Sequence, residues 1–126
     1  MRKRRTVLLK PRRNKYNAVK TVVDGITFDS KAEAARWSVL RLLEKAGAIR
    51  NLERQIKFPL EVSTPDSGPK VIGNYYADFV YWDNEKQTTV IEDVKGFKTQ
   101  LYNWKKQHIE AQYGIKLVEI INGKPV

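Results

Sequence analysis

Two stretches rich in aromatic and β-branched residues, 74–82 and 88–96, constrain the fold of this chain more than any other feature. Polar residues typical of a turn separate them, so the pair predicts two strands joined in a hairpin. Charged residues interrupt the apolar runs, among them Asp78 in the first stretch, and Asp93 and Lys95 in the second. Because side chains two apart on a strand share a face, Asp93 and Lys95 should project together, with Asp78 nearby on the neighbouring strand.

Charged side chains among apolar residues are costly unless they are paired or bind a metal ion. Asp93 and Lys95 could form a simple ion pair, and Asp78 could pair with a surface lysine. Two carboxylates converging with a lysine are also typical of a metal-dependent phosphodiesterase site. The chain has no cysteine, and its one histidine, His108, falls on an apolar helix stripe, where a core histidine is the better interpretation. Carboxylate chemistry with a hard cation such as Mg²⁺, which Mn²⁺ should be able to replace, is therefore favoured.

Two helices are predicted from capping signals. Ser30 and Glu33 match a capping box, and the helix that begins there should stop at Gly47. Thr99 should cap a second helix, which Gly114 ends. The apolar stripe expected at 100° per residue is Ala32, Ala35, Val39, Leu43 and Ala46 in the first helix, and Leu101, Trp104, His108 and Ala111 in the second.

The remaining segments predict strands. Asp24-Gly25 between β-branched runs indicates a tight hairpin. Residues 53–62 alternate as in a strand, in which Pro59 favours an edge position or a bulge, and residues 64–70 are expected to form a loop. Residues 115–121 predict the last strand. The order of hairpin, helix, three strands, helix and strand predicts an α/β or α+β domain, a mixed sheet flanked by helices.

The net charge of +10 is concentrated at the start of the chain. Residues 1–15 hold eight basic residues and no acid, whereas the other 16 basic and 14 acidic residues nearly balance. A basic, flexible arm over 1–15 and one domain over 16–126 are therefore expected. The arm favours nucleic-acid contact through phosphate neutralisation; a solvated tail is the alternative. The DNA-binding candidates in the arm are Arg2, Lys3, Arg4, Arg5, Arg12 and Arg13.

Composition also bears on the compartment. The absence of cysteine suits a reducing cytosol and excludes a disulfide framework. No apolar run approaches the roughly 20 residues that span a membrane. The apolar residues 7–9 are interrupted too early to form the core of a signal peptide. We therefore expect a cytoplasmic protein without a membrane partner.

Three further polar residues, Glu33, Gln55 and Glu92, lie on or near the predicted site elements. Glu33 lies at the border of the first helix's stripe and is a candidate site residue, although the capping box or a salt bridge to Arg36 would also explain it. Glu92 points to the face opposite Asp93, so we interpret it as structural and paired. Gln55, on a strand that should neighbour the hairpin, is a candidate to support the site by hydrogen bonding.

The succession of Glu33, Asp78 and Asp93-x-Lys95 resembles the PD-(D/E)xK nuclease superfamily. The similarity is closest to a family of small phage and prophage proteins assigned to that superfamily. Ala77 stands where the superfamily has proline, and Asp93 fills the Glu/Asp position. The stretches that look alike are 15–18, 23–34, 76–79 and 92–96, followed by Thr99, Tyr102, Lys105 and Lys106.

The resemblance implies a restriction-endonuclease-like fold and assigns roles to these residues. Asp78, Asp93 and the backbone carbonyl of Val94 would bind the metal ion, with Glu33 as a further ligand, direct or through water. Lys95 would orient or help activate the attacking water and stabilise charge on the phosphate. The remaining DNA-binding candidates are Lys98, Tyr102, Lys105 and Lys106, although a solvated helix explains Tyr102 and Lys105 equally well.

The predicted function is a Mg²⁺-dependent DNA endonuclease of phage type. It would act in the cytoplasm of a bacterial host, in recombination, replication or packaging, on branched or flapped DNA such as Holliday junctions. Many branched-DNA nucleases of the superfamily are homodimers, so a dimer is also expected. The alternative is a nucleic-acid-binding protein that uses a nuclease-like fold without catalysis. An RNA-binding protein of ribosomal type would leave the three charged residues of the hairpin unexplained.

Overall fold

The computed structural model describes residues 19–95 and 98–126. The basic arm and its candidates Arg2, Lys3, Arg4, Arg5, Arg12 and Arg13 lie outside the described residues, as do residues 15–18 and Gly96 of the family-like stretches.

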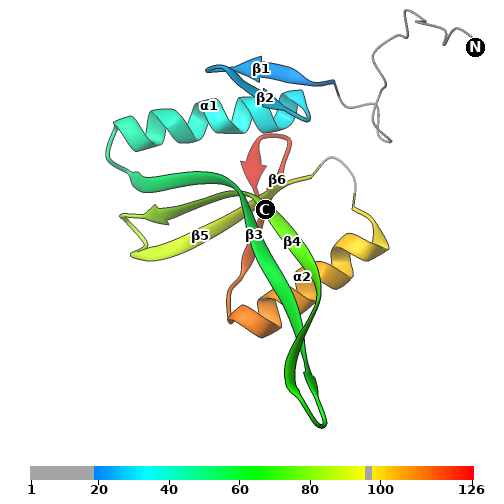
Figure 1. Cartoon of the computed structure of the whole chain (residues 1–126). Helices are drawn as coiled ribbons and strands as arrows, with labels where there is room; N and C mark the ends of the chain where they lie inside the picture. Colours follow the sequence, from blue (N-terminus) through cyan, green and yellow to red (C-terminus); the bar gives the residue numbers. More distant parts are fainter. Residues whose placement is uncertain (1–18, 96–97) are drawn as a thin grey trace, which may run out of the picture.

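The chain folds into two helices and a mixed sheet (Figure 1). A five-stranded sheet has the order β3-β4-β5-β6-β7, in which β5 and β6 are parallel and the other neighbours antiparallel. The α+β class predicted above is therefore confirmed. The elements are β1 (Thr21–Val23), β2 (Ile26–Phe28), α1 (Lys31–Lys45), β3 (Ile49–Thr64), β4 (Gly68–Asp83), β5 (Thr88–Val94), α2 (Gln100–Tyr113), β6 (Leu117–Ile121) and β7 (Lys124–Pro125).

A short β1–β2 hairpin leads into α1, as predicted. Asp24 and Gly25 form its two-residue turn, with φ of 53° and 74°. Positive φ at both positions is what a type I′ hairpin turn requires. The Asp24 carboxylate also accepts a hydrogen bond from the Trp37 indole at 3.1 Å, which fixes the hairpin against α1.

Helix α1 begins at the predicted cap but buries a different face. The Ser30 hydroxyl accepts from the Glu33 amide at 3.1 Å, as the capping box predicts. The predicted stripe is wrong, because Ala32, Ala35, Val39, Leu43 and Ala46 are all exposed. The buried face consists of Ala34, Arg36, Trp37 and Leu40. Trp37 and Leu40 remove more apolar area from water than the small alanines of the predicted stripe, which explains the orientation.

Strands β3 and β4 form one long hairpin whose tip extends beyond the rest of the sheet (Figure 1). The loop predicted for residues 64–70 is shorter than expected: residues 65–67 form a tight turn, and Thr64 already pairs with Gly68. Pro59 lies on β3, which is an edge strand, next to a register shift between Leu60 and Glu61. Both features agree with the prediction, since proline cannot donate to a central ladder.

Helix α2 also has its predicted caps and an unpredicted buried face. The Thr99 hydroxyl accepts from the Tyr102 amide at 3.0 Å, and Gly114 ends the helix with φ of 64°. Tyr102 and Ile109 are buried. The predicted stripe is wrong, since Leu101, Trp104 and Ala111 are exposed and His108 is only half-buried.

The C-terminal half of α2 covers the backbone of edge strand β3. His108 Nε2 donates to the Glu61 carbonyl at 2.8 Å, so this histidine is not the core residue expected from its position. Gln112 accepts from the Glu61 amide at 2.8 Å, and the Tyr113 hydroxyl donates to the Pro59 carbonyl at 2.6 Å. The backbone groups of an edge strand need hydrogen-bond partners, and here the polar side chains of α2 supply them. The predicted apolar stripe would have offered no such partners.

Two apolar clusters hold the helices on opposite faces of the sheet (Figure 1). Neither described helix has the length and apolar character needed to cross a membrane. The α1 cluster contains Phe28, Ala34, Trp37, Leu40, Ile49, Phe79, Tyr81 and Val90. The α2 cluster contains Leu60, Tyr75, Ala77, Ile91, Tyr102, Ile109 and Leu117.

Candidate metal-dependent active site

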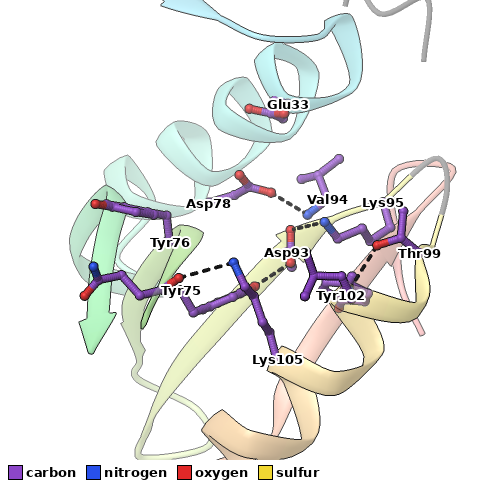
Figure 2. A pocket seen from close by; sticks show the side chains of 12 residues that line it. Glu33, Tyr75, Tyr76, Asp78, Asp93, Val94, Lys95, Thr99, Tyr102 and Lys105 are labelled. Atoms are coloured by element: carbon purple, nitrogen blue, oxygen red, sulfur yellow. Dashed lines mark hydrogen bonds and ion pairs between the residues drawn. The ribbon is translucent and has the colours of Figure 1, made fainter. Parts of the chain in front are cut away.

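One pocket of about 290 Å³ brings together all four residues predicted to be catalytic (Figure 2). Strands β4 and β5 form its floor, and the first turns of α1 and α2 approach it from either side. Its lining residues are Glu33, Asn74, Tyr75, Tyr76, Asp78, Asp93, Val94, Lys95, Thr99, Leu101, Tyr102 and Lys105.

Asp78 is held by one hydrogen bond to each carboxylate oxygen. Oδ1 accepts from Gln55 Nε2 at 3.1 Å, and Oδ2 accepts from the Val94 amide at 2.8 Å. Gln55 therefore lies where it was expected to support the site. Its φ of 52° is left-handed, which is strained for a non-glycine residue in a strand. Strain of this kind persists where surrounding contacts enforce it, and here it turns the amide toward Asp78.

Asp93 is buried and bound on both sides. Its Oδ2 accepts from the hydroxyl of the buried Tyr75, and its Oδ1 lies 3.3 Å from Lys95 Nζ. Burial, followed by the Asp93 charge, raises the pKa of Tyr75, so the tyrosine hydroxyl stays protonated and donates. Sequence reasoning missed Tyr75, because one more aromatic residue in an apolar strand carries no signal of its own.

Glu33 reaches the pocket from the first turn of α1. Burial raises its pKa, and the nearby charges of Asp29 and Asp93 raise it further. The salt bridge to Arg36 that offered a structural explanation is not formed, because Arg36 binds the buried Glu92 at 2.7 Å. Glu33 is therefore an acid facing the two carboxylates, with its amide in the helix cap.

Glu92 lies on the face of β5 opposite Asp93, as predicted, and is fully buried. It accepts two hydrogen bonds from Arg36, at 2.8 and 2.7 Å, and another from the Tyr81 hydroxyl. Hydrogen bonding to Glu92 raises the pKa of Arg36 despite burial. Two adjacent residues of β5 therefore have different surroundings: Glu92 faces α1, and Asp93 faces the pocket.

The DNA-binding candidates of α2 occupy different environments. Tyr102 is 7% exposed and donates to Glu119 Oε2 at 2.9 Å, so its hydroxyl faces inward. Lys98 and Lys106 lie 2.9 and 3.6 Å from Glu119 Oε1. Lys105 lines the pocket, where its Nζ contacts the Asn74 carbonyl at 3.4 Å.

The oxygen atoms of the pocket offer a divalent cation only some of its ligands. Among residues 19–95 and 98–126, no group of three or more His, Cys, Asp or Glu side chains is placed to hold a metal ion. Two carboxylates do meet, because Asp78 and Asp93 line the same pocket and the presence of Asp93 raises the pKa of Asp78. In a strand the N–H and C=O of one residue face the same edge, so the Val94 carbonyl should face Asp78 as its amide does.

The protonation of Asp78 also agrees with a cation site. Burial, then the contact with Asp93 and the charge of Glu33, raise the pKa of Asp78 to about 9. Close carboxylates without a cation favour one shared proton, and a cation would take its place. Two carboxylates, a backbone carbonyl and water fit Mg²⁺, which commonly keeps several waters beside one or two carboxylates. They do not fit a site with three direct carboxylate ligands.

In EDTA, thermal stability should fall as the pH rises from 5 to 9. The pKa of Asp78 is about 9 in the folded protein, against an ordinary value of 3.8 for an aspartate. The unfolded chain therefore loses a proton that the folded chain keeps, and unfolding is favoured as the pH rises through this window. Asp78→Asn should give a shallower dependence and a higher melting temperature at pH 8, measured by circular dichroism. A wild-type melting temperature that rises across this range would contradict the shared-proton description.

Comparison with known proteins gives one family. A family model described as "Protein of unknown function (DUF1064)" matches residues 13–124, which covers the pocket and both helices. None of the curated proteins compared with the chain matches it. Since the match extends over nearly the whole sequence, the chain belongs to the DUF1064 family.

Proposed function

We propose that the protein is a metal-dependent endonuclease that hydrolyses phosphodiester bonds in DNA. The observation that carries the proposal is the convergence of Asp78, Asp93 and Lys95 at one end of a pocket, with Glu33 opposite (Figure 2). An isolated ion pair between Asp93 and Lys95 would explain neither the second carboxylate, the half-buried Asp78, nor the hydrogen bonds that orient both. The resemblance to PD-(D/E)xK nucleases supports the same assignment.

Each residue of the site has a role that its contacts allow. Asp78, Asp93 and the Val94 carbonyl would hold Mg²⁺ or Mn²⁺, with Glu33 acting through a water. The cation, when bound, would lower the pKa of a bound water and polarise the phosphoryl oxygen. Lys95, held 3.3 Å from Asp93, would present its ammonium to a phosphate oxygen and help orient the attacking water. The Tyr75 hydroxyl keeps Asp93 in place.

The rim of the pocket favours DNA with an unpaired segment. Tyr76 is 54% exposed and lines the pocket, as does Lys105, so the pocket offers both an aromatic face and a cation. Unpaired bases stack on exposed aromatic side chains, whereas the bases of an intact duplex are already stacked. We therefore assign branched or flapped DNA as the substrate, in recombination, replication or packaging of a phage. A homodimer would place two such sites on one junction.

Metal-dependent cutting is the first expected result. The full-length protein is incubated with labelled junction, flap, single-stranded and linear duplex DNA, in Mg²⁺, Mn²⁺ or EDTA. Cutting should occur with either cation and stop in EDTA, with junction or flap DNA cut before linear duplex. Binding of all four DNAs without cutting in either cation would instead favour the non-catalytic nucleic-acid-binding protein.

Deleting residues 1–14 should weaken DNA binding and flatten its salt dependence. Each phosphate that the arm neutralises adds about 0.9 to the slope of log affinity against log salt. Fluorescence anisotropy between low and physiological salt measures this slope. As a control, a full-length variant with glutamine at the basic positions of the arm separates charge from chain length. An unchanged slope in both variants would remove the arm from the DNA interface.

A further inference from the structure

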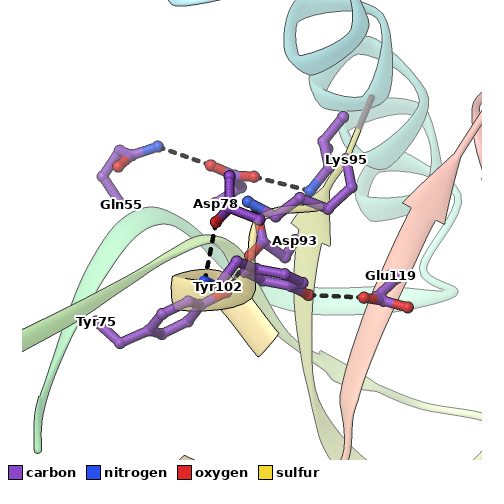
Figure 3. Close-up of polar contacts among 9 residues, drawn as sticks. Gln55, Tyr75, Asp78, Asp93, Lys95, Tyr102 and Glu119 are labelled. Atoms are coloured by element: carbon purple, nitrogen blue, oxygen red, sulfur yellow. Dashed lines mark hydrogen bonds and ion pairs between the residues drawn. The ribbon is translucent and has the colours of Figure 1, made fainter. Parts of the chain in front are cut away.

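The ammonium group of Lys95 lies between partners from two different elements (Figure 3). Its Nζ is 3.3 Å from Asp93 Oδ1 and 4.1 Å from the centroid of the Tyr102 ring. The second distance is well within the limit of about 6 Å for a cation–π contact. Lys95 follows the last residue of β5, so its long side chain depends on such contacts for a fixed position.

The Tyr102 side chain is held in place by its own contacts. The side chain is 7% exposed on the first turn of α2, and its hydroxyl donates to Glu119 Oε2 at 2.9 Å. Glu119 is buried on β6, and its other oxygen accepts from Lys98 at 2.9 Å. The ring can therefore rotate little, because one end is fixed by the helix backbone and the other by a buried carboxylate.

The protonation states suit this arrangement. Burial and the charges of Asp93 and Glu119 raise the pKa of Tyr102, so its hydroxyl remains a donor. Burial alone would raise the pKa of Glu119, but hydrogen bonds from Lys98 and Tyr102 outweigh it and lower the pKa. An ionised acceptor thus faces a neutral donor, which is the stronger class of hydrogen bond.

We propose that Tyr102 is a positioning residue for Lys95, with its ring face holding the ammonium beside Asp93 and Glu119 holding the ring. The inference rests on the proposed function, which gives Lys95 its task at the phosphate. It also changes the expectation for Tyr102, which the resemblance had placed among the DNA contacts. A buried ring beneath the lysine should affect the rate of cleavage and leave the affinity for DNA almost unchanged.

Kinetics of three variants test this role. Tyr102→Leu removes the ring and should lower kcat roughly 10- to 100-fold with little change in KM, because a misplacement of about 1 Å at a reacting group costs on the order of 10²-fold. Tyr102→Phe keeps the ring and should retain most of the wild-type kcat. Ile109→Ala is the matched control, since Ile109 is buried in the same helix and cluster. It should loosen α2 and leave kcat near that of the wild type.

Nuclear magnetic resonance of the Lys95 side chain gives a readout that needs no cleavage. Protons held over an aromatic face are shifted upfield, so the ε-methylene protons should be shifted in the wild type and in Tyr102→Phe, and not in Tyr102→Leu. The proposal would be overturned if Tyr102→Leu kept the wild-type kcat or if all three variants lost activity equally. It would also be overturned if the wild type showed no upfield shift. A wild-type protein that shows the shift and cuts no DNA would defeat the proposed function and retain the contact.

Discussion

Asp93→Asn and Lys95→Ala are each expected to reduce DNA cleavage by at least about 10²-fold, the usual loss when one group that stabilises transition-state charge is removed. Asparagine has the shape of aspartate and can still accept from the Tyr75 hydroxyl, so the fold should persist while the charge is lost. Lys95→Ala removes the ammonium that lies 3.3 Å from the Asp93 carboxylate in the described pocket. Single-turnover cleavage of a labelled flap or junction in Mg²⁺ measures both losses.

DNA binding separates a catalytic role from a structural one. Both variants leave the arm, for which we propose the phosphate contacts, unchanged, so anisotropy in EDTA should give affinities close to that of the wild type. Lys86→Ala is the matched control, because Lys86 is an exposed lysine in the turn at the other end of the same β4–β5 hairpin. Cleavage retained in Asp93→Asn would return the carboxylate to a structural role. Binding lost in both variants would assign these residues to DNA recognition.

The residues of the pocket could be predicted because they lie on strands, where side chains alternate between the two faces at every residue. Alternation placed Asp93 and Lys95 on one face and Glu92 on the other, as found. The antiparallel hairpin then brought Asp78 beside them, and the observed register pairs Phe79 with Glu92. Caps were equally predictable, because a capping hydrogen bond involves neighbours three residues apart.

The buried faces of both helices could not be foreseen, because each includes charged or polar residues. Arg36 is 8% exposed and belongs to the buried face of α1, although a search for apolar residues at helical spacing counts it as polar. On α2 the half-buried Lys105 and Lys106 flank the face of Tyr102, while Trp104 is 71% exposed. Their partners, Glu92 and Glu119 among them, are distant in sequence, so no local period reports them.

The hydrogen bonds of the tyrosine hydroxyls could not be predicted from the sequence either. Tyr75, Tyr81 and Tyr102 each donate to a buried carboxylate, on Asp93, Glu92 and Glu119 respectively. In the sequence they are indistinguishable from other aromatic residues of apolar segments. Only the register of the strands and the placement of α2 bring each hydroxyl to an acid. The orientation of the site therefore depends on contacts that long-range pairing creates, whereas its composition follows from local pattern.

Glu92→Ala is expected to be the most destabilising of the single substitutions considered, at about 3–5 kcal/mol of unfolding free energy, because it leaves a buried guanidinium without its partner. The change also removes the acceptor of the Tyr81 hydroxyl. Such a loss is a large share of the about 5–15 kcal/mol that stabilises a typical domain. Urea unfolding, with the slope checked for constancy, measures it. Arg41→Ala is the control, since Arg41 and Glu44 form a pair at 2.5 Å that is still partly exposed to solvent, where about 1 kcal/mol or less is expected.

The double variant Arg36→Met/Glu92→Leu tests whether the ion pair aligns α1 with the pocket in addition to its effect on stability. Apolar replacement of both members of a buried ion pair often restores stability. Arg36 lies one turn after Glu33 on α1, and Glu92 precedes Asp93 on β5, so their two hydrogen bonds tie the helix to the strand beneath the pocket. We therefore expect the double variant to unfold near the wild-type urea concentration and to cleave DNA more slowly, because Glu33 is no longer held opposite the carboxylates. Full cleavage activity in a stable double variant would show that apolar packing alone aligns α1 with the site.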